Sequence, residues 1–221
     1  MTIAVDSVAA GAASPIAEPT AARAHRTRAH RTRADALRNR ERIVEAAGDL
    51  FVEYGPDAPL DEISRRAGIG NATLYRHFAD RRALTHAVLL SVVIRTADRA
   101  EAAAQLAAAG GDPHFALSRF VHSAVDDKIG VLCGLFVNGD GSPSPEIAAQ
   151  TARLEAAVKE LMERARRDGG LRSDVTLKDL MLAISRLTRP LPGIDCPVSD
   201  LHHHLQFFLD GLKTPFPNPN D

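Results

Sequence analysis

The chain has 221 residues, of which 45% are hydrophobic and 25% charged, and its formal net charge is -1. This is the composition of a soluble globular protein with room for one domain or two small ones, and its short apolar runs predict neither a membrane span nor a secretory signal. Its two cysteines, Cys133 and Cys196, are too few for a disulfide framework or a Cys-rich zinc site, so we expect ordinary thiols in a cytoplasmic protein.

The N-terminal segment, residues 1–34, is predicted to be a disordered, arginine-rich arm. Its first 22 residues are rich in alanine with scattered Pro, Gly and Ser, and Ala-His-Arg-Thr-Arg then occurs at 24–28 and again at 29–33. Residues 23–99 hold 15 Arg, no Lys and 10 acidic residues, a balance of +5 that leaves -6 for the remainder. This asymmetry indicates a DNA-facing first half, with Arg31 and Arg33 expected on DNA; the alternative is a solvated charged tail.

Hydrophobic residues then recur at helical spacing, and turn residues separate four helices in the first half of the chain. The first helix is expected to end at Gly55, the second to begin with Pro59 in its first turn, and Asp80 to cap the fourth. A third, short helix follows the turn at Gly68 and is sized for the DNA major groove. The expected first, third and fourth helices span 36–54, 71–78 and 81–108.

Beyond residue 112 the spacing again predicts only helices, and no stretch has the alternation of a strand. Gly and Pro clusters separate these helices. The expected helical segments are 113–126, a shorter apolar stretch at 131–137, 146–167, 177–187 and 198–212. The sequence therefore predicts an all-α protein.

The segment from Arg42 to Leu84 resembles the N-terminal domain of TetR-type transcriptional regulators. Residues 68–84 read Gly-Ile-Gly-Asn-Ala-Thr-Leu-Tyr-Arg-His-Phe-Ala-Asp-Arg-Arg-Ala-Leu, and the family's characteristic run matches at Gly68, Thr73, Leu74, Tyr75, His77, Phe78 and Leu84. The resemblance implies a three-helix helix-turn-helix DNA-binding domain at 35–84, followed by a helical ligand-binding and dimerisation domain at 85–221.

Carried onto this chain, the resemblance places one group of residues nearest the base edges and another on or near phosphates. Ala58-Pro59 stands where the family often has a hydroxyl residue that touches phosphate, and Gly70 replaces a usual serine. Phe78 is expected in the core. The predicted DNA-binding residues are Asn71, Ala72 and Thr73 at the bases, and Tyr75, His77, Arg81 and Arg82 at phosphates, together with the arm residues above. The ring of Tyr75 is expected to pack while its hydroxyl points outward, and the alternative for His77 is helix packing.

One such module reads only a few base pairs, so specific recognition requires a homodimer on a palindromic operator in double-stranded DNA. The last two helices are the expected interface, where each carries an apolar stripe; the alternative is that these residues form the core of their own chain. The predicted interface residues are Leu180, Met181, Ile184, Leu187, Leu201, Leu205, Phe208 and Leu212.

The resemblance further implies a small-molecule cavity in the C-terminal domain. The candidate lining residues, each of which is also typical of simple core, are Phe115, Phe120, His122, Cys133, Phe136 and Met162. His202, His203 and His204 are consecutive, and because successive helical residues point about 100° apart they do not converge on one ion. We therefore predict no metal site and no cofactor.

The leading hypothesis is a transcriptional repressor that a small-molecule effector releases from its operator. A constitutive or architectural DNA-binding dimer is the alternative. An enzyme built on a helical bundle is the weakest hypothesis, because the sequence has no Ser-His-Asp arrangement, phosphate loop or nucleotide fingerprint.

Overall fold

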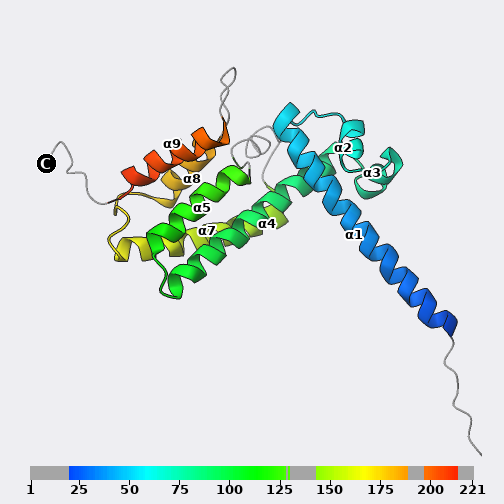
Figure 1. Cartoon of the computed structure of the whole chain (residues 1–221), viewed down its shortest axis with the longest axis horizontal. Helices are drawn as coiled ribbons and strands as arrows, with labels where there is room; N and C mark the ends of the chain where they lie inside the picture. The colour runs from blue at the N-terminus through cyan, green and yellow to red at the C-terminus, as the bar shows by residue number, and fades with distance from the viewer. Residues whose placement is uncertain (1–19, 128, 130–142, 189–196, 214–221) are drawn as a thin grey trace, which may run out of the picture. The chain divides into compact units, whose positions relative to one another are not determined.

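The computed structural model describes residues 20–127, 129, 143–188 and 197–213, with side chains from residue 33 onward. All regular secondary structure in these ranges is α-helical, which confirms the predicted fold class. The chain divides into two compact units, residues 1–39 and 40–221. The second unit holds every helix after the first, and helix labels follow Figure 1.

Helix α1 spans Thr20–Tyr54 and begins 16 residues before its predicted start at 36. The expectation of a disordered arm was therefore wrong for residues 20–34, whose backbone is helical; residues 1–19 lie outside the described ranges. The repeat consists largely of Ala and Arg, two of the best helix formers, and Pro19 is the last proline before it. The charge of the repeat predicts disorder, but its helix propensity prevails. The helix ends as predicted at Gly55, whose φ is 79°.

The next two helices form the predicted helix-turn-helix. Helix α2 spans Leu60–Arg66 and α3 spans Asn71–His77. Pro59 is the residue that precedes α2 rather than part of its first turn. Between the helices Gly68 adopts a φ of 65°, the left-handed conformation that reverses the chain.

Gly68→Ala is expected to lower the free energy of unfolding by about 1–2 kcal/mol, because a Cβ disfavours the left-handed conformation. The added carbon would also lie 2.5 Å from Nη2 of Arg42, which must move aside. Gly70→Ala is the matched control, since Gly70 has a φ of -80° and a Cβ there meets nothing within 4 Å. Urea unfolding measures both, and equal losses would contradict the conformational argument.

Helix α4 spans Arg81–Ala108, as predicted, and the side chain of Asp80 accepts a hydrogen bond from the backbone N–H of Ala83 at 2.7 Å. Helix α5 spans Pro113–Asp126, α7 Pro145–Arg167, α8 Leu177–Leu187 and α9 Val198–Gly211. These ends lie within one residue of the predictions. Side chains cap the starts of three of the helices, Asp112 at α5, Ser144 at α7 and Thr176 in a capping box with Asp179 at α8, whereas α9 starts after Pro197 without a side-chain cap. The apolar stretch at 131–137 lies outside the described residues.

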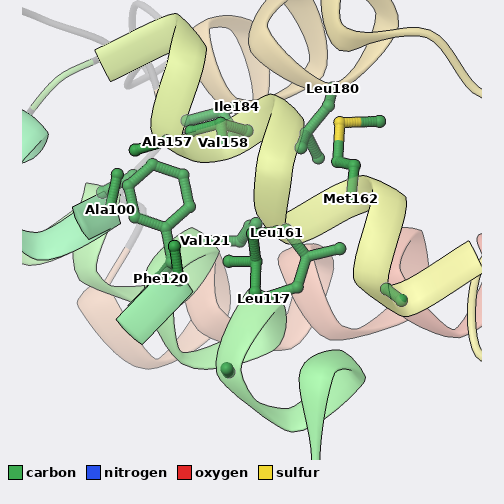
Figure 2. Close-up of a cluster of buried hydrophobic side chains, with 14 of the residues drawn as sticks. Ala100, Leu117, Phe120, Val121, Ala157, Val158, Leu161, Met162, Leu180 and Ile184 are labelled. Carbon is green, nitrogen blue, oxygen red and sulfur yellow. The ribbon is translucent and has the colours of Figure 1, made fainter. Parts of the chain in front are cut away.

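Helix α4 packs against α5 and α7, α5 also packs against α7 and α9, and α8 packs against α7 and α9 (Figure 1). Their buried side chains form one core, part of which Figure 2 shows. Between α4 and α7, Arg153 forms ion pairs with Asp98 and Glu101. No helix in the described ranges is both long enough and apolar enough to span a membrane.

A second core lies around the helix-turn-helix, and α4 contributes to both cores. The residues of the second core come from α1 to α4, with one from α7: Ile43, Ala46, Ala47, Leu50, Phe51, Ala58, Ile63, Ala67, Leu74, Phe78, Leu84, Ala87, Val88, Leu89, Val92 and Ile147. This core extends beyond residue 84, where the sequence places the domain boundary.

Candidate nucleic-acid interface and ligand cavity

Helix α3 has one buried side chain, which packs into the core, and most of its other residues are exposed to solvent. Leu74 is its buried residue, and Phe78, directly after the helix, is buried as predicted. Asn71, Ala72 and Arg76 are exposed, and 55% of Tyr75 is exposed. Thr73 and His77 are half-buried. The arrangement gives a short helix whose polar face is available to a groove of DNA.

Asn71 is less free than the sequence indicates. Its Oδ1 accepts a hydrogen bond from the hydroxyl of Ser64, which is buried in α2. A bidentate contact with adenine needs both this oxygen and the Nδ2 group. An amide oxygen has two lone pairs, so Oδ1 can still accept one more hydrogen bond and Nδ2 keeps its donors, while the bond to Ser64 restricts the orientation in which Asn71 meets a base edge.

Arg81 holds the start of α4 against the turn that joins α1 to α2. Its Nη1 donates hydrogen bonds to the carbonyl oxygens of Pro56 at 2.8 Å and Ala58 at 2.7 Å. The sequence predicts a phosphate contact for this residue, but the geometry gives it a role within the chain. The neighbouring Arg82 is exposed.

Several other arginines near α3 are also engaged within the chain. Arg65 and Arg66 pair with Glu62 and Glu53, and the side-chain hydrogen bond from Arg65 lowers the pKa of Glu62. Arg40 lies over the ring of Phe78, 4.4 Å from its centroid, and donates to the carbonyl oxygen of His77.

Within the described part of the chain, Arg76 and Arg82 have no ion pair or hydrogen bond, which leaves both cations for phosphate. The sequence marks Arg76 as one of the hydrogen-bond donors on the short helix, but the predicted set of DNA-binding residues does not include it. In the first unit Arg33 is exposed, and the side chain of Arg31 lies outside the described ranges.

A cavity of about 400 Å³ lies between α4, α5, α7 and α8. It sits where the two cores meet, since Val92 and Ile147 belong to the core around the helix-turn-helix and Phe120 and Ile184 to the other. Its described lining residues are Val92, Val93, Thr96, Phe120, Ala124, Ile129, Pro143, Ile147, Thr151, Leu154, Met181, Ile184 and Ser185.

Of the residues predicted to line a ligand cavity, Phe120 does so. Phe115 is 56% exposed, and Met162 is packed in the core (Figure 2), so neither prediction is supported. Cys133 and Phe136 lie outside the described residues. Helical spacing identifies inward-facing positions, but it does not say which of them meet a packed neighbour and which an open space.

His122 does not line the cavity either, because it contacts α9. Its Nδ1 lies 3.0 Å from Nδ1 of His202, and its Nε2 lies 3.2 Å from Oε1 of Gln206. The ring of His203 lies edge-on to Phe207, with centroids 4.3 Å apart. The ring of His202 thus contacts His122, whereas that of His203 contacts Phe207. Among the described residues, no three or more potential metal ligands lie close enough together to hold an ion.

Of the residues predicted for a dimer interface, four are buried in the core of their own chain, namely Leu180, Ile184, Leu205 and Leu212. Their burial favours the alternative for these four, because an apolar stripe on a helix covers the chain's own core first. Met181, Leu187, Leu201 and Phe208 pack partly buried against that core, and their place in an interface stays a prediction. The exposed large apolar residues of α8 and α9 are Leu182, Val198 and Phe207.

Asp127, at the end of α5, is a buried carboxylate whose pKa burial raises, although Arg99 and Arg95 oppose the shift. Arg99 Nη1 lies 3.0 Å from its Oδ2, and Arg95 Nε lies 3.6 Å from Oδ1. Since the folded pKa lies above the unfolded one, the folded state binds the extra proton. The usual pKa of an aspartate is near 3.8. The contribution of this carboxyl to stability therefore falls as the pH rises from that value through the folded pKa.

Asp127→Asn keeps the shape of the side chain and removes this titration. The free energy of unfolding of the variant minus that of the wild type is expected to increase between pH 4 and pH 7. Urea unfolding across this range measures the difference. A difference that shrinks with rising pH would mean that the two arginines outweigh burial.

Comparison with known proteins matches both parts of the chain. Residues 43–88 match the family model of bacterial regulatory proteins of the tetR family, and residues 112–214 match the C-terminal domain of SbtR-like transcriptional regulators. The uncharacterized HTH-type transcriptional regulator TtgW of Pseudomonas putida is 44% identical over 58 residues, which are 26% of this chain and 43% of TtgW. The match to this curated relative thus spans less than half of its length.

Solved structures extend the likeness to most of the chain. LfrR from Mycobacterium smegmatis, solved in complex with proflavine, shares the fold with a TM-score of 0.58 at 23% identity, over 81% of this chain and 98% of LfrR. The TetR transcription regulatory protein from Mycobacterium vanbaalenii is 33% identical, with a TM-score of 0.61, over 83% of this chain and 99% of that protein. With its helix-turn-helix and helical C-terminal domain, the chain belongs to the TetR family of DNA-binding transcriptional regulators.

Proposed function

We propose that the protein is a transcriptional repressor that binds a palindromic operator as a homodimer and leaves it when a small molecule occupies the cavity. The observation that carries the proposal is the course of α4. This one helix begins at Arg81, after the short link 78–80 that follows α3 (Figure 1). It also supplies Val92, Val93 and Thr96 to the cavity.

A ligand that displaces α4 acts on the same helix whose first residue holds the α1–α2 turn through the carbonyl oxygens of Pro56 and Ala58. A small rotation of α4 would therefore move the helix-turn-helix with it. A ligand that fits the rotated state better shifts the population away from the DNA-binding arrangement. LfrR, which has the same fold and was solved with proflavine, is consistent with a ligand-binding role for this domain.

We place the dimer interface on the outer faces of α8 and α9. Phe207→Asp is expected to weaken the dimer at least about 100-fold, since buried aromatic anchors at an interface contribute about 2 kcal/mol or more each and two copies meet in a two-fold dimer. Sedimentation velocity measures the dissociation constant. Phe115→Asp is the matched control, because Phe115 is similarly exposed but lies on α5. Equal weakening by both variants would place the interface elsewhere.

Fluorescence anisotropy with DNA from beside the protein's own gene tests the proposed function. A scrambled duplex serves as the control, across a salt series. We expect tight binding to one site at two protomers or a multiple, and weaker, salt-labile binding to the scrambled duplex. Equal binding to both duplexes would favour an architectural role, and specific binding that no ligand relieves would favour a constitutive regulator.

A further inference from the structure

The cavity between α4, α5, α7 and α8 has a chemical character that narrows the ligand it can hold. Every described residue that lines it is uncharged, and apart from three hydroxyl groups the lining is apolar. A second cavity, of about 260 Å³, lies beside α1 and α4 and has the opposite character, with Asp49, Arg95, Asp126 and Asp127 among its lining residues. Of these two cavities, the second alone offers charged partners to a ligand from its described lining.

A charged group placed in the first cavity would lose its hydration without gaining a counter-charge from the described lining, and that loss disfavours binding. The volume of about 400 Å³ is near the lower end of the range typical of small-molecule sites, roughly 300–1,000 Å³. The ligand is therefore small as well as neutral.

The three hydroxyl residues, Thr96, Thr151 and Ser185, come from α4, α7 and α8. Thr96 already donates its hydroxyl proton to the carbonyl oxygen of Val92 at 2.8 Å, and it is 4% exposed. What Thr96 can offer the cavity is an oxygen lone pair, so it is complemented by a ligand that donates a hydrogen bond.

The apolar residues of the lining include Phe120, which has an aromatic ring, and Met181, which has a thioether. An aromatic ligand can stack favourably on the ring of Phe120, and the sulfur of Met181 makes favourable contacts with aromatic rings. We infer that the cavity binds a neutral, mostly apolar, aromatic molecule with one N–H or O–H donor directed at Thr96. This inference rests on the proposed function, because it names the ligand class of the effector site proposed there.

Two dyes that differ by one charged group test the inference on the full chain. N-phenyl-1-naphthylamine is neutral and carries one N–H, and 8-anilinonaphthalene-1-sulfonate adds a sulfonate to the same skeleton. Fluorescence titration without DNA is expected to give saturable binding of the neutral dye at one per protomer. The sulfonate should bind at least ten-fold more weakly. Equal or tighter binding of the sulfonate overturns the inference.

Variants then locate the bound dye. Ser185→Phe fills the cavity and should weaken binding of the neutral dye at least ten-fold. Ser173→Phe adds the same ring at an exposed position outside the lining and should leave dye binding unchanged. Thermal melting shows whether Ser185→Phe folds. If it does not, Thr151→Leu takes its place, because this substitution fills less of the cavity. Thr96→Val removes the hydrogen-bond acceptor and should weaken binding of the dye about five-fold, which corresponds to the loss of one hydrogen bond. Unchanged binding in all folded cavity variants overturns the inference.

Addition of the neutral dye to the operator complex separates the two proposals. Dye binding without release of DNA would contradict the proposed control by ligand, while the ligand class stands. Specific operator binding by a protein that binds neither dye would overturn the ligand class and leave the DNA-binding function intact.

Discussion

Leu74→Ala is expected to weaken specific operator binding by about 100-fold. Leu74 is the buried residue of α3, with 2% of its surface exposed, and α3 is only seven residues long. Replacing a buried leucine by alanine typically costs about 3 to 5 kcal/mol, and a helix this short is not stable without packing. If about 3 kcal/mol of the binding free energy is used to hold α3 in its position on DNA, the affinity for the operator falls by about 100-fold.

Anisotropy with the operator and urea unfolding together measure this effect. Leu106→Ala is the control, because Leu106 is 44% exposed on α4 and should cost less than about 1 kcal/mol. Operator affinity within three-fold of the wild type, together with the expected loss of stability, would show that α3 does not depend on Leu74 for its position.

Arg81→Ala is expected to lower the free energy of unfolding by about 2 kcal/mol, because this variant cannot make the two hydrogen bonds from a charged donor to Pro56 and Ala58. Operator affinity should fall as the turn loosens. The slope of log Kd against log salt concentration should stay unchanged, because Nη1 of Arg81 is engaged by the two carbonyl oxygens within the chain.

Arg82→Ala is the matched comparison, one residue along the same helix. It should leave the unfolding free energy almost unchanged and reduce the salt slope by about 0.9 for each phosphate that the arginine neutralises in the wild type. The reverse pattern, with Arg81 changing the slope and Arg82 the stability, would restore the phosphate role that the family resemblance implies for Arg81.

The helix boundaries were predictable because the groups that fix them are local. Asp80, Pro113 and Gly55 each act on backbone within a few residues, and the corresponding ends agree with the structure. The start of α1 was missed because an arginine-rich repeat was interpreted by its charge, whereas Ala and Arg also favour helix.

The site was predictable in position and less so in detail. The motif at 68–84 located the recognition helix, and the exposure of Asn71, Ala72 and Tyr75 agrees with it. The bonds from Ser64 to Asn71 and from Arg81 to the α1–α2 turn join residues that only the tertiary fold brings together. No periodicity in the sequence encodes such partners. For the same reason, apolar stripes on α8 and α9 did not distinguish core from interface.

The sharing of α4 between two cores also limits how the protein can be divided. A fragment that ends at residue 84 would lack Ala87, Val88, Leu89 and Val92, all buried in the core around the helix-turn-helix, as well as Ile147 from α7. Recombination that exchanged the C-terminal half at this point would leave that core open on one side. A functional hybrid therefore has to inherit α4 with the DNA-binding half and match the new C-terminal half to the far end of α4. The two halves of this chain thus do not evolve as freely separable modules.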